Sequence, residues 1–423
     1  MKILVVGGGG REHALAWKLA GDSGRPEVFC APGNAGTAEI ATNLEIGAED
    51  LNALRGWAAE ARPDLTVIGP EAPLCAGLAD TLSAEGLTVF GPSAAAARLE
   101  GSKHFAKEVM RAAGVPTAEA RGFTDAAEAL AYLRERGAPI VVKAEGLAAG
   151  KGVTVCETVD HAEQAVREAL LDRAFGDAGN RILIEDCLSG EEASILALVD
   201  GQTVVMLASS QDHKRALDND EGPNTGGMGA YSPAPVITDD LWPVIREQVF
   251  DRTLAELGKR GITYRGVLYA GLMIDGTVPK VLEFNCRFGD PETQAILPRL
   301  NCDLAPALAA CARGELAEDM IAWRREACAC VVMASGGYPG AYVKGKPIAG
   351  LAEAAQLEDV VVFHAGTTRY NGETATSGGR VLGVTALGAD LEKAVERAYK
   401  AVSMISFDGA HYRTDIAHRA FKR

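Results

Sequence analysis

The sequence predicts an α/β and α+β multidomain protein that opens with a parallel sheet. At 423 residues the chain is too long for one ordinary hydrophobic core, so several domains are expected. Residues 1–101 alternate short apolar runs with segments of helical spacing, which is typical of an open parallel sheet with helices on both faces. Further along, two apolar runs flank Asp275-Gly276, which is a typical sequence for the turn of an antiparallel hairpin.

The composition excludes several classes of protein. A hydrophobic content of 48% with 23% charged residues is that of a soluble globular protein. The net charge of −15, without any basic run, argues against nucleic acids and membrane surfaces as partners. The nine cysteines show no zinc spacing and no apolar run reaches membrane-spanning length, so we expect a cytoplasmic protein with reduced thiols. Nothing in the sequence indicates an obligatory protein partner.

The first domain, residues 1–101, should carry its ligand site where its strands end. The apolar runs predict strands at Ile3–Val6, Val28–Ala31, Leu65–Ile68 and Thr88–Phe90, and helical spacing predicts helices at Glu12–Leu19, Leu51–Glu60 and Leu74–Glu85. Gly7–Gly10 joins the first strand to the first helix, and such a loop presents backbone N–H groups to an anion. The loop could instead serve only as a tight turn. A dinucleotide-binding fingerprint is rejected, because the third glycine and the later acidic residue are missing.

A second glycine-rich loop follows the predicted strand Ile140–Ala144. The run Gly146–Gly152 is not a Walker A loop, because its spacing differs and no Ser or Thr follows Lys151. It predicts a hairpin between strands 140–144 and 153–156, whose small residues let backbone amides approach phosphate groups. Residues 210–232 form a long polar segment rich in glycine and asparagine. Loops of this length inside compact domains are usually functional.

The stretch Val281–Gln294 concentrates the candidate catalytic residues. Glu283 and Asn285 lie on one face of a predicted strand, because side chains alternate along a strand, and their oxygens are ligands of the kind that Mg²⁺ or Mn²⁺ prefers. Arg287 and Asp290 follow directly. The alternative for Glu283 is an ordinary surface ion pair with a lysine. Residues 327–423 then predict a small α+β domain, with strands at Ala327–Ala334, Val360–Phe363 and Arg380–Thr385 and a helix at Leu391–Val402.

Four runs carry a resemblance to a known family. They are Gly7–Trp17 (GGGGREHALAW), Ala31–Ala38 (APGNAGTA), Gly69–Leu74 (GPEAPL) and Val281–Gln294 (VLEFNCRFGDPETQ). In these runs the chain resembles the phosphoribosylamine–glycine ligases, which are ATP-grasp enzymes of purine synthesis. The chain departs from the family pattern at Gly8, where the resemblance leads us to expect Asn. The resemblance implies an ATP-grasp domain at 102–326 with a mobile lid subdomain at about 120–190, and a C-terminal domain at 327–423.

The resemblance also implies which residues bind ATP. Lys103 and Lys143 are expected to contact phosphate groups, and Lys214 is expected to act on the triphosphate. The turn after residue 184 is expected to contact adenine. A ribose contact is expected from Glu192. The ATP-binding residues implied in this way are Lys103, Lys143, Gly146, Gly150, Lys151, Gly152, Glu185, Cys187, Leu188, Glu192 and Lys214.

On the substrate side, the resemblance implies that the first domain holds phosphoribosylamine. The implied substrate-binding residues are Gly8, Gly9, Gly10, Arg11, Glu12, Asp212, Asn224, Arg287, Asp290 and Pro291. Arg287 has the planar shape that grips a carboxylate, and Asp290 is suited to orient an amine, so Lys143, Lys214, Arg287 and Asp290 are the expected catalytic residues. Some ATP-grasp enzymes carry a further metal-binding acid at the position of Gly271, so the number of metal ions stays open.

The activity implied is the joining of glycine to 5-phosphoribosylamine with ATP, through a glycyl phosphate intermediate, giving glycinamide ribonucleotide, ADP and phosphate. ATP is then a co-substrate, and Mg²⁺ or Mn²⁺ the cofactor. Two alternatives remain, which are another ATP-grasp ligase for a different carboxylate and amine, and a nucleotide-binding protein without turnover. The cluster of Glu283, Asn285, Arg287 and Asp290 argues against the second.

Overall fold

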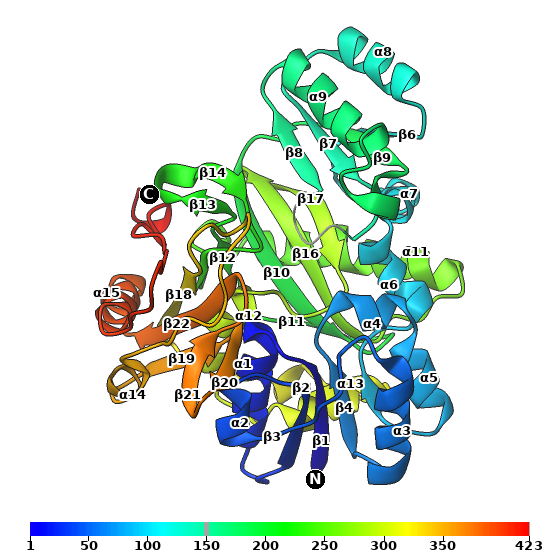
Figure 1. The fold of residues 1–423 in the computed structure, drawn as a ribbon. Helices are drawn as coiled ribbons and strands as arrows, with labels where there is room; N and C mark the ends of the chain where they lie inside the picture. Colours follow the sequence, from blue (N-terminus) through cyan, green and yellow to red (C-terminus); the bar gives the residue numbers. More distant parts are fainter. Residues whose placement is uncertain (148–151, 423) are drawn as a thin grey trace.

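The computed structural model describes residues 1–147 and 152–422 and has three main sheets and a separate smaller one (Figure 1). The first sheet has the order β3-β2-β1-β4-β5, and its strands are parallel, as predicted. Its strands are β1 (Lys2–Gly7), β2 (Glu27–Pro32), β3 (Thr42–Asn43), β4 (Leu65–Ile68) and β5 (Val89–Phe90). The helices of this region are α1 (Gly10–Ala20), α2 (Thr37–Ile40), α3 (Leu51–Ala61), α4 (Glu71–Cys75), α5 (Leu78–Ala84) and α6 (Ala94–Gly101).

Strand β1 is buried on both faces, because helices cover both sides of the sheet. Leu4 packs in one core with Leu54 of α3, whereas Ile3 packs in another with Leu15 of α1. The single helix predicted for Leu74–Glu85 is instead two helices, α4 and α5. Gly77 separates them with φ +86°, a left-handed conformation that a continuous α-helix does not contain.

The second sheet, β11-β10-β16-β17, is antiparallel and lies at the centre of the molecule (Figure 1). Strands β16 (Gly266–Asp275) and β17 (Val278–Asn285) form the predicted hairpin, and β10 (Glu191–Val199) and β11 (Val204–Met206) complete the sheet. The helices around it are α7 (Lys103–Ala113), α10 (Leu241–Ile245), α11 (Arg252–Lys259) and α13 (Ala305–Arg313). Helix α12 (Glu292–Ile296) follows β17 and packs against α1 and the third sheet, described below.

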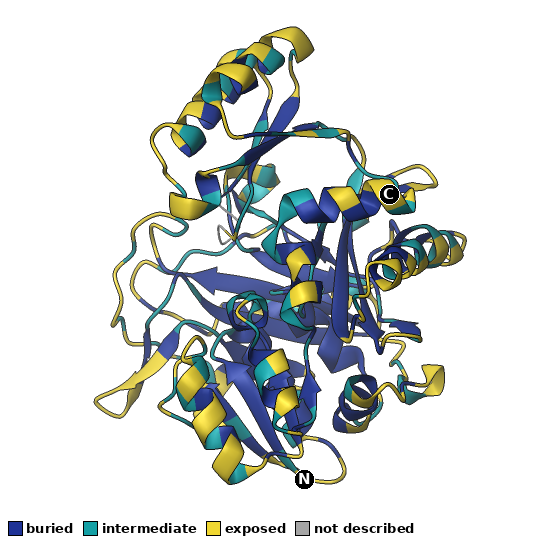
Figure 2. Cartoon of the chain, turned by 90° about the vertical axis from the view of Figure 1, so that its right-hand side faces the viewer, coloured by how far each residue is buried: buried dark blue, intermediate teal, exposed yellow. Residues whose placement is uncertain are grey.

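A smaller sheet, β6-β9-β7-β8, forms an outlying body with α8 and α9 (Figure 1). Its elements are β6 (Ala120–Phe123), α8 (Ala126–Arg136), β7 (Ile140–Ala144), β8 (Val153–Cys156), α9 (Val159–Leu170) and β9 (Ile182–Asp186). It has its own hydrophobic core, in which Leu133 and Val166 are fully buried, while the outer faces of its helices are exposed (Figure 2). We refer to this body, residues 120–186, as the outer subdomain.

The third sheet has the order β12-β15-β18-β22-β19 and is antiparallel. Strands β18 (Ala327–Ala334), β19 (Val360–His364) and β22 (Arg380–Gly388) follow the predicted boundary at residue 326, but β12 (Gln211–Asp212) and β15 (Gly229–Ser232) come from the polar segment before it. That segment therefore lies on the same sheet as the C-terminal strands. The remaining elements are α14 (Leu351–Ala354), α15 (Leu391–Val402) and the hairpins β13 (Arg215–Leu217)/β14 (Glu221–Asn224) and β20 (Thr367–Tyr370)/β21 (Glu373–Thr376). Within the described residues, no helix has the length and apolarity needed to cross a membrane.

Candidate active site

A cavity of about 330 Å³ lies where the first domain meets the C-terminal sheet. We call it the glycine pocket, after the glycine residues that line it. The loop between β1 and α1 forms one wall, and segments 365–367 and 377–380 form the opposite wall. Its lining residues are Gly8, Gly9, Gly10, Gly33, Asn34, Asp290, Ala365, Gly366, Thr367, Ser377 and Arg380. The structure thus brings the three predicted loop glycines together with Asp290.

Arg11 and Glu12, also predicted to bind substrate, lie behind this loop rather than among the lining residues. The Glu12 carboxylate accepts a hydrogen bond from the Gly9 N–H at 2.7 Å, and the Arg11 guanidinium contacts Glu12 at 2.5 Å and the Phe288 carbonyl at 3.2 Å. Both side chains are buried. The bond from Gly9 to Glu12 is one half of a capping box, since glycine has no side chain to make the other half. Together, Arg11 and Glu12 fix the loop that faces the pocket.

Arg380 spans the far side of the glycine pocket. Its guanidinium donates to the carbonyls of Asp290 at 2.8 Å and Gly226 at 2.5 Å, and lies 3.3 Å from the Asp290 carboxylate. Gln294 donates to the other carboxylate oxygen at 2.9 Å. Burial raises the pKa of Asp290, but Arg380, Arg11 and Gln294 outweigh burial and hold that pKa below its usual value. Asp290 is therefore an oriented, ionised acceptor that faces the pocket.

Arg287 makes its ion pairs with two carboxylates of the first domain. It lies 3.2 Å from Glu71 and 2.9 Å from Glu100. Glu100 also accepts from the backbone N–H of Cys286 at 2.8 Å. Burial lowers the pKa of Arg287, but Glu100 and Glu71 outweigh it and the net shift is upward. A substrate carboxylate that binds Arg287 would have to share the guanidinium with these two acids.

Two predicted ATP-side residues, Glu185 and Lys143, meet at strand β9 together with Lys107, which was not predicted. Glu185 is buried and pairs through one oxygen with Lys107 at 3.1 Å and Lys143 at 3.0 Å. Lys143 also donates to the carbonyl of Leu282 at 3.1 Å, which links the outer subdomain to strand β17. The second oxygen of Glu185 is buried without a hydrogen-bond partner among the described residues. It is therefore a ready acceptor for an N–H group of a ligand.

Lys103 lies beside the start of the predicted hairpin, since its ammonium donates to the Gly146 carbonyl at 3.0 Å. Burial lowers the pKa of Lys103, and the charge of Glu283 opposes this shift. Asn224 contacts the carbonyl of Val153 at 3.4 Å, next to Gly152. Cys187 and Leu188 are half-buried in the turn after β9, whereas Gly150 and Lys151 lie outside the described residues.

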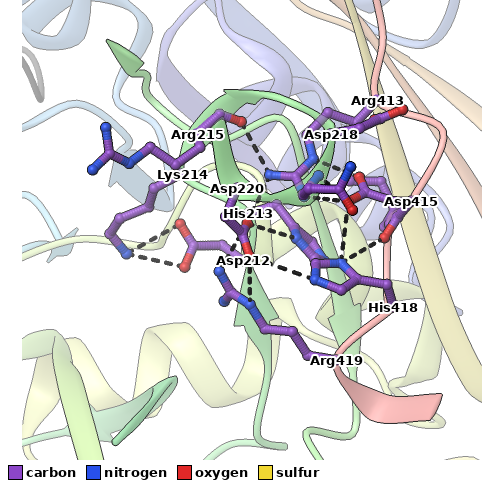
Figure 3. Close-up of polar contacts among 12 residues, drawn as sticks. Asp212, His213, Lys214, Arg215, Asp218, Asp220, Arg413, Asp415, His418 and Arg419 are labelled. Atoms are coloured by element: carbon purple, nitrogen blue, oxygen red, sulfur yellow. Dashed lines mark hydrogen bonds and ion pairs between the residues drawn. The ribbon is translucent and has the colours of Figure 1, made fainter. Parts of the chain in front are cut away.

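Lys214 pairs with two acids, one of which, Asp212, is the last residue of strand β12. Its ammonium is 3.0 Å from Asp212 (Figure 3) and 3.1 Å from Glu192. Burial lowers the pKa of Lys214, but Asp212 and Glu192 outweigh burial and raise it well above its usual value, with Glu283 contributing. The structure therefore groups three predicted residues. Pro291 lies close to Gly227.

Glu283 and Asn285 project from one face of β17, near Lys103 and Lys214. Among the described residues, neither side chain makes a hydrogen bond or ion pair, so the surface-pair alternative for Glu283 is not seen. Gly271 is the register partner of Glu283 and supplies no carboxylate. Across 1–147 and 152–422, no group of three His, Cys, Asp or Glu residues could hold a metal alone. One carboxylate and one amide oxygen fit a cation that keeps water or phosphate as its other ligands.

Sequence reasoning did not identify the residues that reach the site from distant parts of the chain. These are Asn34, Glu71, Glu100, Lys107, Thr367, Ser377 and Arg380. A signal exists for two of them, because Ser377-Gly378-Gly379-Arg380 is a glycine-rich turn between strands. Asn34 and Glu71 lie in the runs Ala31–Ala38 and Gly69–Leu74, which carry the family resemblance without assigning a role to either residue. The others have no local signature.

The antiparallel central sheet, the outer subdomain over it and the lysine–carboxylate groups between them are the features of the ATP-grasp class. The structure is similar to biotin carboxylase from Campylobacter jejuni, at a TM-score of 0.71 and 16% identity over 97% of this chain and 92% of that one, which shows the shared fold. It is more similar to phosphoribosylamine–glycine ligase from Thermotoga maritima, at a TM-score of 0.85 and 34% identity over 98% of this chain and 100% of that one.

The chain belongs to the phosphoribosylglycinamide synthetase family. The family's N domain matches residues 1–100, its ATP-grasp (A) domain residues 101–293 and its C domain residues 328–419. Phosphoribosylamine–glycine ligases from Escherichia coli O157:H7 and Pseudomonas aeruginosa PAO1 are 54% and 52% identical to it, each over 100% of this chain and 99% of the relative. The resemblance in the four sequence runs is thereby confirmed, as is the multidomain ATP-grasp fold.

Proposed function

We propose that this protein joins glycine to 5-phosphoribosylamine at the expense of ATP, as the names of its relatives indicate, and forms glycinamide ribonucleotide in purine synthesis. The observation that carries the proposal is the course of residues 283–290. This stretch begins beside Lys103 and Lys214 and ends at Asp290 in the glycine pocket. A phosphoryl group and an amine held at its two ends would face one shared reaction space.

In the proposed mechanism, a carboxylate oxygen of glycine attacks the γ-phosphorus of ATP and ADP leaves. The ribosylamine nitrogen then attacks the glycyl carbonyl carbon, phosphate leaves, and the nitrogen loses a proton. The first step brings two anions together, and each unit-charge repulsion at about 4 Å amounts to roughly 4 kcal/mol at an effective dielectric near 20. Lys103, Lys143 and Lys214 offset this repulsion.

Mg²⁺ or Mn²⁺ would be held by Glu283 and Asn285, where it would neutralise charge on the phosphates. Glu185 is suited to accept from the adenine amino group through its unpaired oxygen, next to Cys187 and Leu188. Glu192 would bind the ribose hydroxyls. Gly146, Gly150, Lys151 and Gly152 would cover the phosphates and exclude water.

On the other side, Gly8, Gly9 and Gly10 would hold the 5′-phosphate of phosphoribosylamine, with the loop fixed from behind by Arg11 and Glu12. Asp290 would orient the amine, and Arg287 the carboxylate of glycine. Asp212, Asn224 and Pro291 would complete this side. We further propose a cytoplasmic protein with domains at 1–101, 102–326 and 327–423, acting without a nucleic acid, membrane or obligatory protein partner.

An isotope experiment tests the order of bond formation. Glycine labelled with ¹⁸O in its carboxylate is incubated with ATP, a divalent cation and phosphoribosylamine, and the released phosphate is analysed by mass spectrometry. One labelled oxygen should appear in phosphate for each glycinamide ribonucleotide formed. Unlabelled phosphate would exclude the glycyl phosphate route. ADP release that responds to a different carboxylate and amine, but not to these substrates, would instead favour another ligase.

A further inference from the structure

The C-terminal segment holds the loop that carries Lys214 from behind. Residues 411–419 run along residues 213–220 and bond to them repeatedly (Figure 3). We call these contacts the C-terminal clamp. They are His411 to the Ala216 carbonyl at 2.8 Å, Arg413 to the Arg215 carbonyl at 3.2 Å, the Thr414 N–H to Asp218 at 2.8 Å, the Asn219 N–H to Asp415 at 2.8 Å, the Ala417 N–H to His213 at 2.9 Å, and Arg419 to Asp220 at 2.9 Å.

Arg413 is the centre of the clamp and has no exposed surface. Its guanidinium contacts Asp220 at 2.9 Å and makes two bonds to Asp415, at 2.7 and 2.8 Å. Burying a guanidinium is unfavourable unless its charge and N–H groups are satisfied, and here two carboxylates and a carbonyl satisfy them. A simple terminal tail docked on a sheet would not require such a group.

Successive side chains of residues 212–214 point in different directions, which separates the clamp from the active site. Lys214 pairs with Asp212 and Glu192. The intervening His213 points the other way, toward the C-terminal segment (Figure 3). The His213 Nε2 accepts from the Ala417 N–H, so the ring proton of the neutral form is on Nδ1, which is 3.8 Å from Asp220. Burial lowers the pKa of His213, which agrees with a neutral ring.

We propose that the C-terminal clamp positions the ammonium of Lys214 for phosphoryl transfer, with Arg413 as its principal positioning residue. The proposal rests on the proposed role of Lys214. The clamp holds the residues on both sides of Lys214, the imidazole of His213 and the backbone carbonyl of Arg215, while the Lys214 side chain projects toward Glu192. Loosening the loop would misplace the lysine, and misplacement by about 1 Å can cost on the order of a hundredfold in rate.

Four variants test the proposal. Arg413→Gln removes the central charge, Arg413→Lys keeps it, and Asp218→Asn weakens the exposed contacts with Thr414 without burying an unpaired charge. Arg313→Gln is the matched control, because Arg313 is exposed and pairs with nearby Glu315. Each variant is first checked by circular dichroism and thermal melting. The kcat and the KM for phosphoribosylamine are then measured, together with hydrogen exchange of residues 212–217.

We expect kcat to fall about tenfold in Arg413→Gln and severalfold in Asp218→Asn, with partial recovery in Arg413→Lys and no change in the control. The KM for phosphoribosylamine should stay within about twofold, because none of the clamp residues lines the glycine pocket. Faster exchange at 212–217 with unchanged kcat in the folded variants would overturn the proposal and leave the clamp purely structural. If Arg413→Gln does not fold, Asp218→Asn decides between these outcomes.

Lys214→Met separates failure of this proposal from failure of the proposed function. If Lys214→Met lowers kcat but the clamp variants do not, only the clamp proposal fails. If Lys214→Met leaves kcat unchanged, Lys214 has no role in the reaction and the clamp proposal falls with it. If the wild-type protein does not ligate glycine and phosphoribosylamine at all, the proposed function itself is wrong.

Discussion

The glycine pocket and the proposed phosphate side of the active site, which carries Lys143, Lys214 and Glu283, are built in opposite ways. The pocket is lined by backbone and small side chains, with one ion pair between Arg380 and Asp290. On the phosphate side, Lys143 and Lys214 are already paired with carboxylates. The first region can accept an anion with little rearrangement, whereas the second must exchange existing ion pairs for contacts with ATP and a cation.

This difference determines how each region should respond to mutation. Removing one member of a buried ion pair leaves an uncompensated charge, which typically costs about 3–5 kcal/mol. Substitutions of the pocket lining act instead through shape and through the field at the anion. Variants of the phosphate side should therefore affect kcat most strongly, and variants of the pocket should affect the KM for phosphoribosylamine.

The largest effect is expected for Glu283→Gln. The amide cannot supply the negative charge that a divalent cation needs, so kcat should fall on the order of a hundredfold or more if the contact is worth about 3 kcal/mol. Stability should change little, because the Glu283 carboxylate has no ion pair among the described residues. Steady-state kinetics at saturating Mg²⁺ and a melting curve measure both quantities. A near-normal kcat would contradict the assignment of Glu283 as a metal ligand.

The next largest effect is expected for Ser377→Asp in the glycine pocket. A carboxylate there should repel the substrate phosphate and raise the KM for phosphoribosylamine at least tenfold, about 1.4 kcal/mol. The Kd for Mg-ATP should stay within about twofold. Ser377 is a better position for this test than Gly8, because a Cβ at Gly8 would lie 2.5 Å from the Gly33 carbonyl oxygen.

Ser377→Asn is the matched control for that experiment, since it has nearly the same shape without the charge. Its KM for phosphoribosylamine should remain close to the wild-type value. If the two variants raise KM equally, the effect is steric. If ATP binding weakens and the KM for phosphoribosylamine does not change, the pocket serves the nucleotide and the contrast between the two regions is wrong.

The two regions also differ in how far the sequence could predict them. The Gly7–Gly10 loop and the β16–β17 hairpin are local features, and both were predicted correctly as structure from spacing and turn residues. The partners of the charged residues were not predicted. Glu71 and Glu100 pair with Arg287, although they lie far from it in the sequence, in a different family domain. Hydrophobic periodicity carries no information about such pairs.

The placement of β12 and β15 shows the same limit. Their sequence resembles a polar loop, because both strands are short and carry polar residues such as Asp212 and Ser232. The other strands of their sheet lie after residue 326, so the local sequence does not indicate the pairing. Only the packing of the complete chain reveals that they extend the C-terminal sheet. Arg380 and Ser377 enter the pocket for the same reason, since strand β22 and the turn before it come to lie opposite Gly8.

A third prediction concerns the outer subdomain. It covers the phosphate side of the proposed active site, and within the described residues the glycine pocket has no comparable cover. The amides of β7, β8 and Gly152 should exchange severalfold more slowly when Mg-ATP is added, because a lid that closes over nucleotide protects them. Amides of the Gly8–Gly10 loop should change less. Hydrogen exchange with mass spectrometry measures both. Equal protection of β7 and β8 with and without nucleotide would contradict the lid.

The smallest effect near neutral pH is expected for Arg380→Gln, and its sign tests the electrostatics of the pocket. Burial raises the pKa of Asp290, and Arg380 is the largest of the charges that lower it, followed by Arg11. The ionised carboxylate is present above its folded-state pKa and is lost as pH falls through that value. Removing the Arg380 charge should raise this pKa, so the acid limb of kcat/KM for phosphoribosylamine should move to higher pH.

Arg380→Lys is the matched variant for this last prediction, because it keeps the positive charge while losing the planar fork that donates to the Gly226 and Asp290 carbonyls. Its acid limb should therefore stay near that of the wild-type protein, even if kcat falls. At pH 8 the Gln variant should lie within about threefold of wild type, because Asp290 is ionised there and Arg11 still faces it. If the two variants share one pH profile, Arg380 acts on Asp290 through geometry alone. The charge of the Arg380–Asp290 ion pair would then matter less for the pocket than the ion pairs of Lys143 and Lys214 matter for the phosphate side.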